Sequence, residues 1–228
     1  MTPPSSSASD TPDEAAQRAL AWAHSARFLT TASRLDQLPA SERPEIAFVG
    51  RSNAGKSTAI NTLAQQKRLA FASRTPGRTQ HINLFEVGPK DAPDALFADL
   101  PGYGYAAVER AAKLRWQEVM ADYLRLRRPL HGVVLMIDSR LGFTDLDKSL
   151  LALMAPRLAN GEVRLLAVLT KADKLNRSQG QAALQAAQGV LAEVSGENTD
   201  ISVSLFSALK RQGVGDVALA LRSWVHKT

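Results

Sequence analysis

The residues best suited to chemistry form a glycine-rich segment between an apolar run, 46–49, and a helical pattern. The segment reads Gly50, Arg51, Ser52, Asn53, Ala54, Gly55, Lys56 and Ser57, followed by Thr58. It matches the G-x-x-x-x-G-K-[ST] pattern of a phosphate-binding loop in the strand-then-helix context that the pattern requires. Backbone N–H groups of such a loop point at an anion, Lys56 can reach the β- and γ-phosphates, and the Ser57 hydroxyl can ligate Mg²⁺. The pattern predicts a nucleoside triphosphate with magnesium as the ligand.

A second motif ends the strand expected over 95–99. Its residues are Asp99, Leu100, Pro101 and Gly102, a D-x-x-G at the edge where open α/β sheets bind ligands. The Asp99 carboxylate can hold Mg²⁺, usually through a water, and the Gly102 N–H can sense the γ-phosphate. The alternative is a plain turn, but the position after the phosphate loop favours a functional interpretation.

Two further segments predict guanine recognition. The first is Thr170, Lys171, Ala172 and Asp173, which resembles the N-K-x-D motif with Thr in place of Asn. One carboxylate can accept hydrogen bonds from both N1–H and the N2 amino group of guanine, whereas adenine would leave Asp173 unpaired. The second segment is Phe206, Ser207 and Ala208, an S-A-K type loop whose N–H groups can contact guanine O6.

A polar segment between the first helix and the second strand, 74–80, contains Gly77, Arg78 and Thr79. In this position a threonine can complete the Mg²⁺ shell when the triphosphate is present, and Thr79 is favoured because it lies directly before the strand. The alternative is an ordinary flexible loop.

Short apolar strands alternate with helical patterns from Glu45 onward, which predicts a mostly parallel sheet with helices on both faces. The link 88–93 is too short for a parallel crossover, so its two strands are expected to be antiparallel. We therefore expect an α/β, P-loop GTPase three-layer fold with a six-stranded sheet and one antiparallel edge strand. The expected strands are 45–49, 81–87, 95–99, 132–137, 163–169 and 201–206. The expected helices are 56–66, 108–127, 145–159, 178–195 and 214–226.

Composition bounds the remaining possibilities. Residues 1–13 form a Pro/Ser-rich tail expected to be disordered, 14–44 a helix and lead-in segment, and 45–228 the nucleotide-binding domain. The absence of cysteine excludes disulfides and thiolate metal sites, and the apolar runs are too short to span a bilayer. We expect a cytoplasmic monomer. The net charge is +6 and residues 1–17 contribute −3, which leaves +9 on the remainder. A nucleic-acid partner or a merely basic surface can both explain this charge.

With five motifs in order, the chain looks like a translation-factor-related GTPase. The residues within and around these motifs resemble those of the bacterial EngB (YihA/YsxC) GTPases. The resemblance rests on the phosphate loop and on the segments 75–80, 99–106, 123–130 and 137–140. It implies GTP and GDP as ligands, with Mg²⁺ at Ser57 and Thr79, and it makes Thr170 a regular residue of the family. It also implies a GTP-hydrolysing assembly factor for the large ribosomal subunit, with its RNA and proteins as partners, linked to cell division and septation.

The expected chemistry has a gap at Tyr103, where many GTPases place the glutamine that orients water. Intrinsic hydrolysis is therefore expected to be slow, with Lys56, Thr79 and Gly102 completed by a partner or an ion. Asn53 resembles the residue that binds K⁺ in several GTPases lacking that glutamine, although it can equally be a turn residue. A P-loop ATPase or nucleotide kinase, and a nucleotide-gated binding module, are the competing hypotheses. RNA contacts are expected from arginines that can alternatively be solvated: Arg74, Arg78, Arg125, Arg127 and Arg128.

Overall fold

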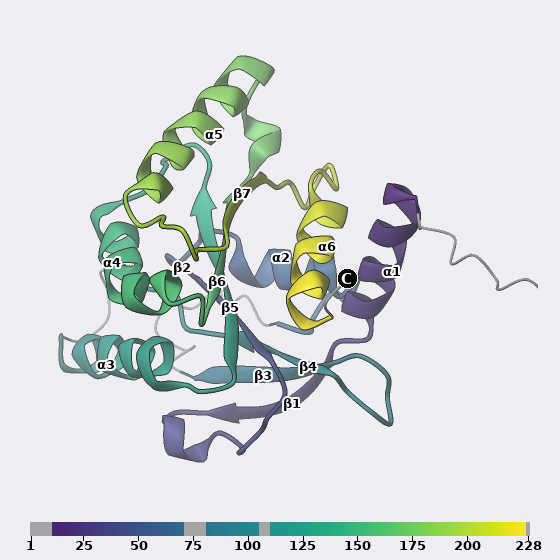
Figure 1. Cartoon of the computed structure of the whole chain (residues 1–228), viewed down its shortest axis with the longest axis vertical. Helices are drawn as coiled ribbons and strands as arrows, with labels where there is room; N and C mark the ends of the chain where they lie inside the picture. Colours follow the sequence, from purple (N-terminus) through teal and green to yellow (C-terminus); the bar gives the residue numbers. More distant parts are fainter. Residues whose placement is uncertain (1–10, 71–80, 105–109, 227–228) are drawn as a thin grey trace, which may run out of the picture.

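The computed structural model describes residues 11–70, 81–104 and 110–226, and within 110–116 only the backbone. Its central feature is a seven-stranded sheet with the order β1-β3-β4-β2-β5-β6-β7 (Figure 1). The strands are β1 (Arg27–Ala32), β2 (Glu45–Gly50), β3 (Ile82–Val87), β4 (Ala95–Asp99), β5 (Leu130–Asp138), β6 (Arg164–Thr170) and β7 (Ile201–Leu205). The helices are α1 (Pro12–His24), α2 (Lys56–Leu63), α3 (Arg110–Leu126), α4 (Asp145–Ala159), α5 (Arg177–Ala192) and α6 (Val214–Val225).

The predicted α/β class is confirmed. Strands β4, β2, β5, β6 and β7 pair in parallel, and β3 pairs antiparallel with β4 as the short link predicts. Buried parallel strands read as continuous apolar runs because helices cover both faces of such a sheet. The all-buried strands β2 and β4 fit this rule.

The sheet has seven strands rather than the six expected. The additional strand, β1, comes from the lead-in segment and pairs antiparallel with β3, so β3 is second from the edge. Strand β1 has only one buried residue, Ala32, and its register shifts between Phe28 and Thr30. An edge strand with so few buried residues lacks the alternating apolar pattern by which strands are recognised. The division into domains stays a prediction, but the lead-in segment contributes to this sheet.

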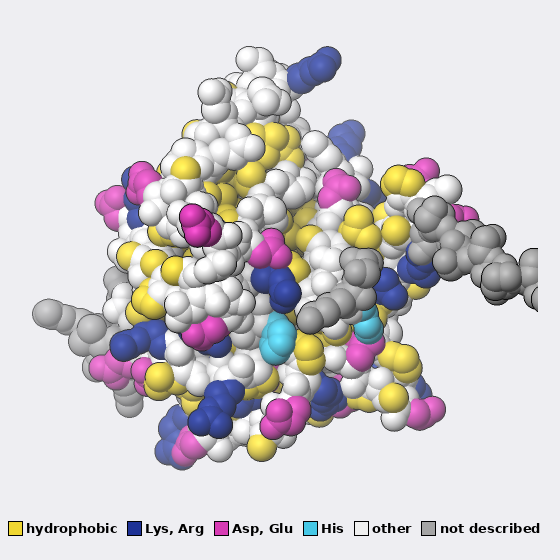
Figure 2. Space-filling model, in the orientation of Figure 1, with side chains coloured by type: hydrophobic (Ala, Val, Ile, Leu, Met, Phe, Trp, Pro, Cys, Tyr) yellow, Lys and Arg dark blue, Asp and Glu magenta, His cyan; other side chains and the backbone are white. Residues whose placement is uncertain are grey.

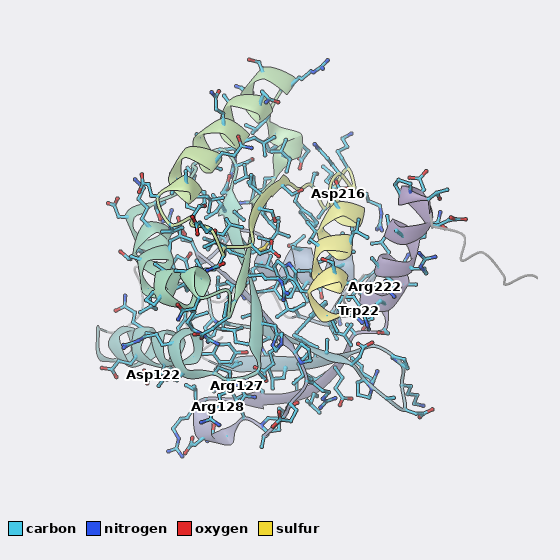
Figure 3. All side chains as sticks on the ribbon, viewed as in Figure 1. Trp22, Asp122, Arg127, Arg128, Asp216 and Arg222 are labelled. Atoms are coloured by element: carbon cyan, nitrogen blue, oxygen red, sulfur yellow. The ribbon has the colours of Figure 1, made fainter. Side chains whose placement is uncertain are left out.

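Two apolar layers sandwich the sheet. One contains buried residues of α1, α2 and α6, and the other buried residues of α3, α4 and α5. Helix α1 is fixed by Trp22, which Figure 3 labels. Its ring packs edge-on to Phe97 with centroids 5.5 Å apart, and its Nε1–H donates to Asp94 at 2.8 Å. The predicted three-layer arrangement is therefore present. None of the helices in the described ranges is long and apolar enough to cross a membrane.

Parallel strands end at a common edge of the sheet, and this geometry determines where the motifs lie. Strands β2, β4, β5 and β6 end at Gly50, Asp99, Asp138 and Thr170. Ligands bind outside the carboxyl ends of strands in open α/β sheets. The fold therefore gathers the predicted motifs at one edge.

Candidate nucleotide-binding site

The phosphate loop connects β2 to α2. Gly55 is the N-cap residue of α2 with φ of +92°, a backbone conformation that side chains with a Cβ disfavour. No side chain in the described part of the chain caps this helix. Its first N–H groups are thus oriented toward the loop, as an anion-binding helix terminus requires.

Lys56 and Asp99 form a buried ion pair across the site. Their side chains are 9% and 1% exposed, and Lys56 Nζ donates to Asp99 Oδ1. The other carboxylate oxygen, Asp99 Oδ2, is buried and has no hydrogen-bond partner among the described residues. A buried carboxylate oxygen without a partner is costly unless a cation or donor reaches it. Oxygen atoms of this kind fit Mg²⁺, which favours one or two carboxylates together with phosphate oxygens.

The D-x-x-G segment packs directly on the phosphate loop. The Ser52 N–H donates to the Tyr103 carbonyl at 2.8 Å, and the Tyr103 N–H donates to the Gly50 carbonyl at 3.2 Å. A Cβ on Gly102 would lie 3.1 Å from the Ser52 backbone, which leaves little room for any larger residue. A movement of the D-x-x-G segment must therefore displace the phosphate loop, and the reverse.

The Tyr103 side chain reaches the N-terminal turn of α4. Its hydroxyl donates to Asp147 Oδ1 at 2.5 Å, while Asp147 Oδ2 accepts from the Thr144 N–H at 2.7 Å. Burial, and then the Asp147 charge, raise the pKa of the Tyr103 phenol far above its ordinary value. The neutral, hydrogen-bonded phenol is thus a structural group and supplies no base.

The residues of the T-K-x-D motif contact the phosphate loop. The Thr170 hydroxyl is buried and lies 2.6 Å from the Ala54 carbonyl oxygen and 3.0 Å from that of Ile137. Lys171 Nζ donates to the Asn53 carbonyl at 2.8 Å. Threonine therefore replaces the expected asparagine contact with a hydroxyl contact to the same loop.

Asp173 is positioned by the S-A-K type loop. The Ser207 hydroxyl donates to Asp173 Oδ1 at 2.7 Å, and this hydrogen bond lowers the pKa of the Asp173 carboxyl. The Ala172 N–H donates to the Phe206 carbonyl at 3.1 Å, which joins the two segments through their backbones. An ionised carboxylate held in this way can accept the paired N–H donors of guanine.

Asn53 has φ of +67° and an exposed side chain. Asparagine tolerates this left-handed conformation better than most residues, so the turn alone accounts for its presence. The exposed carboxamide nevertheless remains accessible to an ion from solvent. The other expected residues, Gly77, Arg78 and Thr79, lie outside the described residues, as do Arg74 and the tail 1–10.

Asp138 is a site residue to which the sequence analysis assigned no role. Its carboxylate accepts from Lys171 Nζ at 2.8 Å and from Arg140 Nε and Nη2 at 2.9 and 2.7 Å. Hydrogen bonds from Arg140 first, and then from Lys171, hold the pKa of this carboxyl well below its usual range. Its position at the carboxyl end of β5, beside β6, is the signal that could have identified it. Asp138 thus holds the Lys171 ammonium in place at this edge of the sheet.

Of the three arginines expected to contact RNA at the end of α3, Arg127 does not fit that expectation. Its guanidinium donates to both carboxylate oxygens of Glu45 at 2.9 and 2.5 Å and to the Pro39 carbonyl at 3.0 Å. Only 12% of its side chain is exposed. Arg127 is a structural residue, whereas Arg125 and Arg128 are exposed.

Comparisons with known proteins show the family of this chain. Residues 45–171 match the family described as 50S ribosome-binding GTPase. A relative from Albidiferax ferrireducens, "Probable GTP-binding protein EngB", is 58% identical over 91% of this chain and 97% of its own length. A relative of the same name from Polaromonas sp. is 55% identical over 98% of this chain and 87% of its own length.

Solved structures of low sequence identity share the fold. One is a probable GTP-binding protein engB, with a TM-score of 0.59 and 17% identity over 81% of this chain and 100% of that one. Another is Era in complex with MgGDPNP and a fragment of 16S ribosomal RNA, with a TM-score of 0.63 and 19% identity over 83% and 59% of the two chains.

The fold and the family match together define a P-loop GTPase, which decides against the nucleotide kinase alternative. More narrowly, the identities with relatives of that name over nearly the whole length place the chain in the EngB family of GTP-binding proteins, as its motif wording predicts.

Proposed function

We propose that this chain is a GTP-hydrolysing switch for assembly of the large ribosomal subunit, needed for normal cell division and septation. The observation that carries the GTP part is Asp173, held by Ser207 beside Lys171 at the same sheet edge as the phosphate loop. The family description, 50S ribosome-binding GTPase, supports the ribosomal part. Such a protein would act in the cytoplasm as a monomer.

Nucleotide binding would break the ion pair between Lys56 and Asp99 and give each side chain a new partner. Lys56 Nζ would turn from Asp99 to the β- and γ-phosphates, because a triphosphate offers it more negative charge. The Asp99 carboxylate, with Ser57 and Thr79, would then hold Mg²⁺. Bound Mg²⁺ neutralises charge that develops on the phosphates during hydrolysis.

The described residues supply charge stabilisation but no group in place to orient water. Tyr103 is held at Asp147, and Gly102 offers only its backbone N–H. Intrinsic hydrolysis would therefore be slow and would need a partner or an ion. The exposed Asn53 carboxamide has an oxygen of the kind that binds K⁺, so K⁺ is the proposed ion.

Depletion of the protein in the cell that makes it tests the ribosomal proposal. Loss should lower the amount of mature large subunit in sucrose gradients, let large-subunit precursors accumulate and produce elongated cells. Re-expression of the wild-type chain should restore both properties, and re-expression of Asp173→Asn should not. Normal gradients in depleted cells would contradict the ribosomal role.

A further inference from the structure

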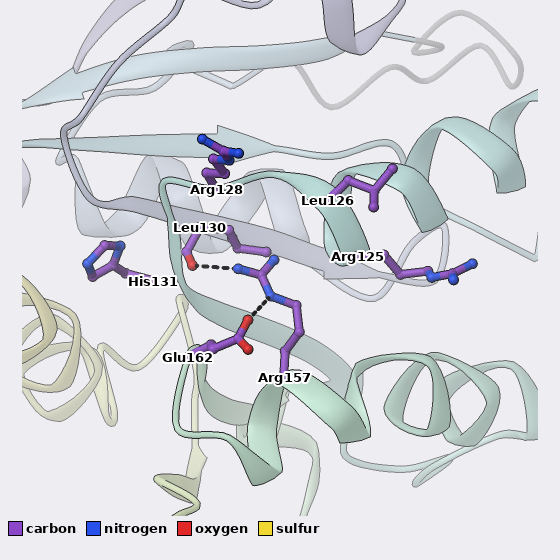
Figure 4. A pocket seen from close by; sticks show the side chains of 7 residues that line it. All are labelled: Arg125, Leu126, Arg128, Leu130, His131, Arg157 and Glu162. Carbon is purple, nitrogen blue, oxygen red and sulfur yellow. Dashed lines mark hydrogen bonds and ion pairs between the residues drawn. The ribbon is translucent and has the colours of Figure 1, made fainter.

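A groove with basic walls lies at the end of the sheet opposite to the nucleotide site. It has a volume of about 450 Å³ and is lined by Arg125, Leu126, Arg128, Leu130, His131, Arg157 and Glu162 (Figure 4). Strand β5 begins beside it at Leu130 and ends at Asp138 in the nucleotide site. At a rise of about 3.3 Å per residue, the two sites lie about 26 Å apart along this strand. The groove is therefore separate from the nucleotide site.

Of the three arginines that line the groove, Arg157 already has hydrogen-bond partners within the protein. Arg157 Nη1 donates to the Leu124 carbonyl at 2.9 Å and to the Arg127 carbonyl at 3.2 Å. Figure 4 shows that its Nε also pairs with Glu162, at 3.2 Å. These carbonyls belong to the C-terminal end of α3, where a cation is favourable. Arg157 thus fixes the groove and neutralises its one acidic residue.

The other two arginines, Arg125 and Arg128, are exposed and have no hydrogen-bond or ion-pair partner in the described ranges. With His131 neutral, the three arginines and one glutamate give the lining a net charge of +2. A free guanidinium presents paired N–H donors that match a phosphate bidentately. Figure 2 shows Lys and Arg side chains interspersed with Asp and Glu on the visible face. At the groove the one acidic lining residue, Glu162, pairs with Arg157, so no carboxylate of the lining compensates Arg125 and Arg128.

We propose that this groove binds backbone phosphates of RNA, with Arg125 and Arg128 as the contacting residues. The inference rests on the proposed function, because that function supplies RNA as the polyanion. A protein partner is less favoured, since protein interfaces centre on buried aromatic anchors and no Trp, Tyr or Phe is among the seven lining residues. Leu126, which is 66% exposed, offers an apolar surface for a ribose.

The test measures binding of RNA extracted from purified large subunits to the full chain loaded with a non-hydrolysable GTP analogue. Arg125→Ala with Arg128→Ala removes both contacts, and Lys90→Ala with Arg177→Ala removes the same charge from exposed residues elsewhere. The groove variant should bind about tenfold more weakly, and its salt dependence should fall by about 1.5 in log–log slope. The control should change less than about twofold. Unchanged GTP affinity in both variants verifies folding.

Equal weakening by both variants would overturn the inference, because the charge would then act diffusely. Intact binding to extracted RNA with lost binding to whole subunits would also overturn it and would indicate a protein partner. Replacing both arginines with lysine should keep the salt slope but lose part of the affinity, because lysine lacks the bidentate fork. If the wild-type chain does not bind large subunits, and the groove variant alone loses RNA binding, the proposed function would be defeated while the groove is sustained.

Discussion

At the scale of single residues, Asp99 and Lys56 hold each other in the arrangement that the nucleotide would replace. Both are buried, so separating them without a replacement partner would be costly. The triphosphate and Mg²⁺ would supply those partners together. Binding of nucleotide and of metal should consequently be coupled, and chelation of Mg²⁺ should weaken GTP binding.

Asp173 should determine which base the nucleotide site prefers. In Asp173→Asn the amide should pair with the 2-oxo group of xanthine, so preference should shift from GTP to XTP by about 100-fold or more, in line with the penalties for unpaired polar groups. Competition between labelled GDP and each nucleotide measures the shift. Ser207→Ala is the matched control, since it loosens Asp173 without inverting its hydrogen bonding. It should weaken GTP binding and leave the preference for guanine.

Asn53 carries the prediction about ions. Hydrolysis should be faster in K⁺ than in Na⁺ at equal ionic strength, and removal of the side chain should abolish the difference. Asn53→Gly is the suitable variant, because φ of +67° would strain alanine at this position. Steady-state phosphate release in the two salts checks this. Identical rates for the wild-type chain would leave Asn53 as a turn residue only.

The motif residues were predictable because their chemistry needs fixed types at fixed spacing. Asp138 was not, since one aspartate after a strand is common and its role depends on Lys171 from the neighbouring strand. The same holds for the hydroxyl contact of Thr170 with Ala54. Side-chain partners that come from distant segments leave no local pattern in the sequence.

At the scale of elements, the contact between Tyr103 and Asp147 links the D-x-x-G loop to α4. Tyr103→Phe would leave Asp147 Oδ1 without its donor, so the free energy of unfolding should fall by about 1–2 kcal/mol. Hydrolysis should change less than about twofold, because a phenol held at Asp147 takes no part in orienting water. Urea unfolding and single-turnover hydrolysis provide the two readouts. A large drop in hydrolysis at normal stability would make Tyr103 a catalytic residue.

The elements themselves were largely predictable. Strands such as β2 and β5 are apolar runs, and several of the predicted strands are directly followed by a nucleotide-binding motif. Strand β1 was missed because an edge strand needs little burial, and only Phe28, Thr30 and Thr31 hint at it through β propensity. The seventh strand of the sheet could therefore be identified only from the structure.

At the scale of the whole molecule, Glu45 connects the start of β2 to the end of α3. It is fully buried and accepts from Tyr123 at 2.7 Å as well as from Arg127. Arg127 is labelled in Figure 3. Arg127→Met would leave this carboxylate with one donor, and the free energy of unfolding should fall by about 3–5 kcal/mol. The adjacent Arg128→Met, an exposed residue, should change it by less than about 0.5 kcal/mol. Similar losses in both variants would contradict a structural role for Arg127.

If the proposed function holds, GTP switches this molecule between free and ribosome-bound states. The most direct test of this switch is co-sedimentation of the chain with purified large ribosomal subunits in the presence of a non-hydrolysable GTP analogue, GDP or no nucleotide. The GTP analogue should bring the chain into the subunit fraction, and GDP should not. Binding that ignores the nucleotide, or no binding in any of the three conditions, would contradict it.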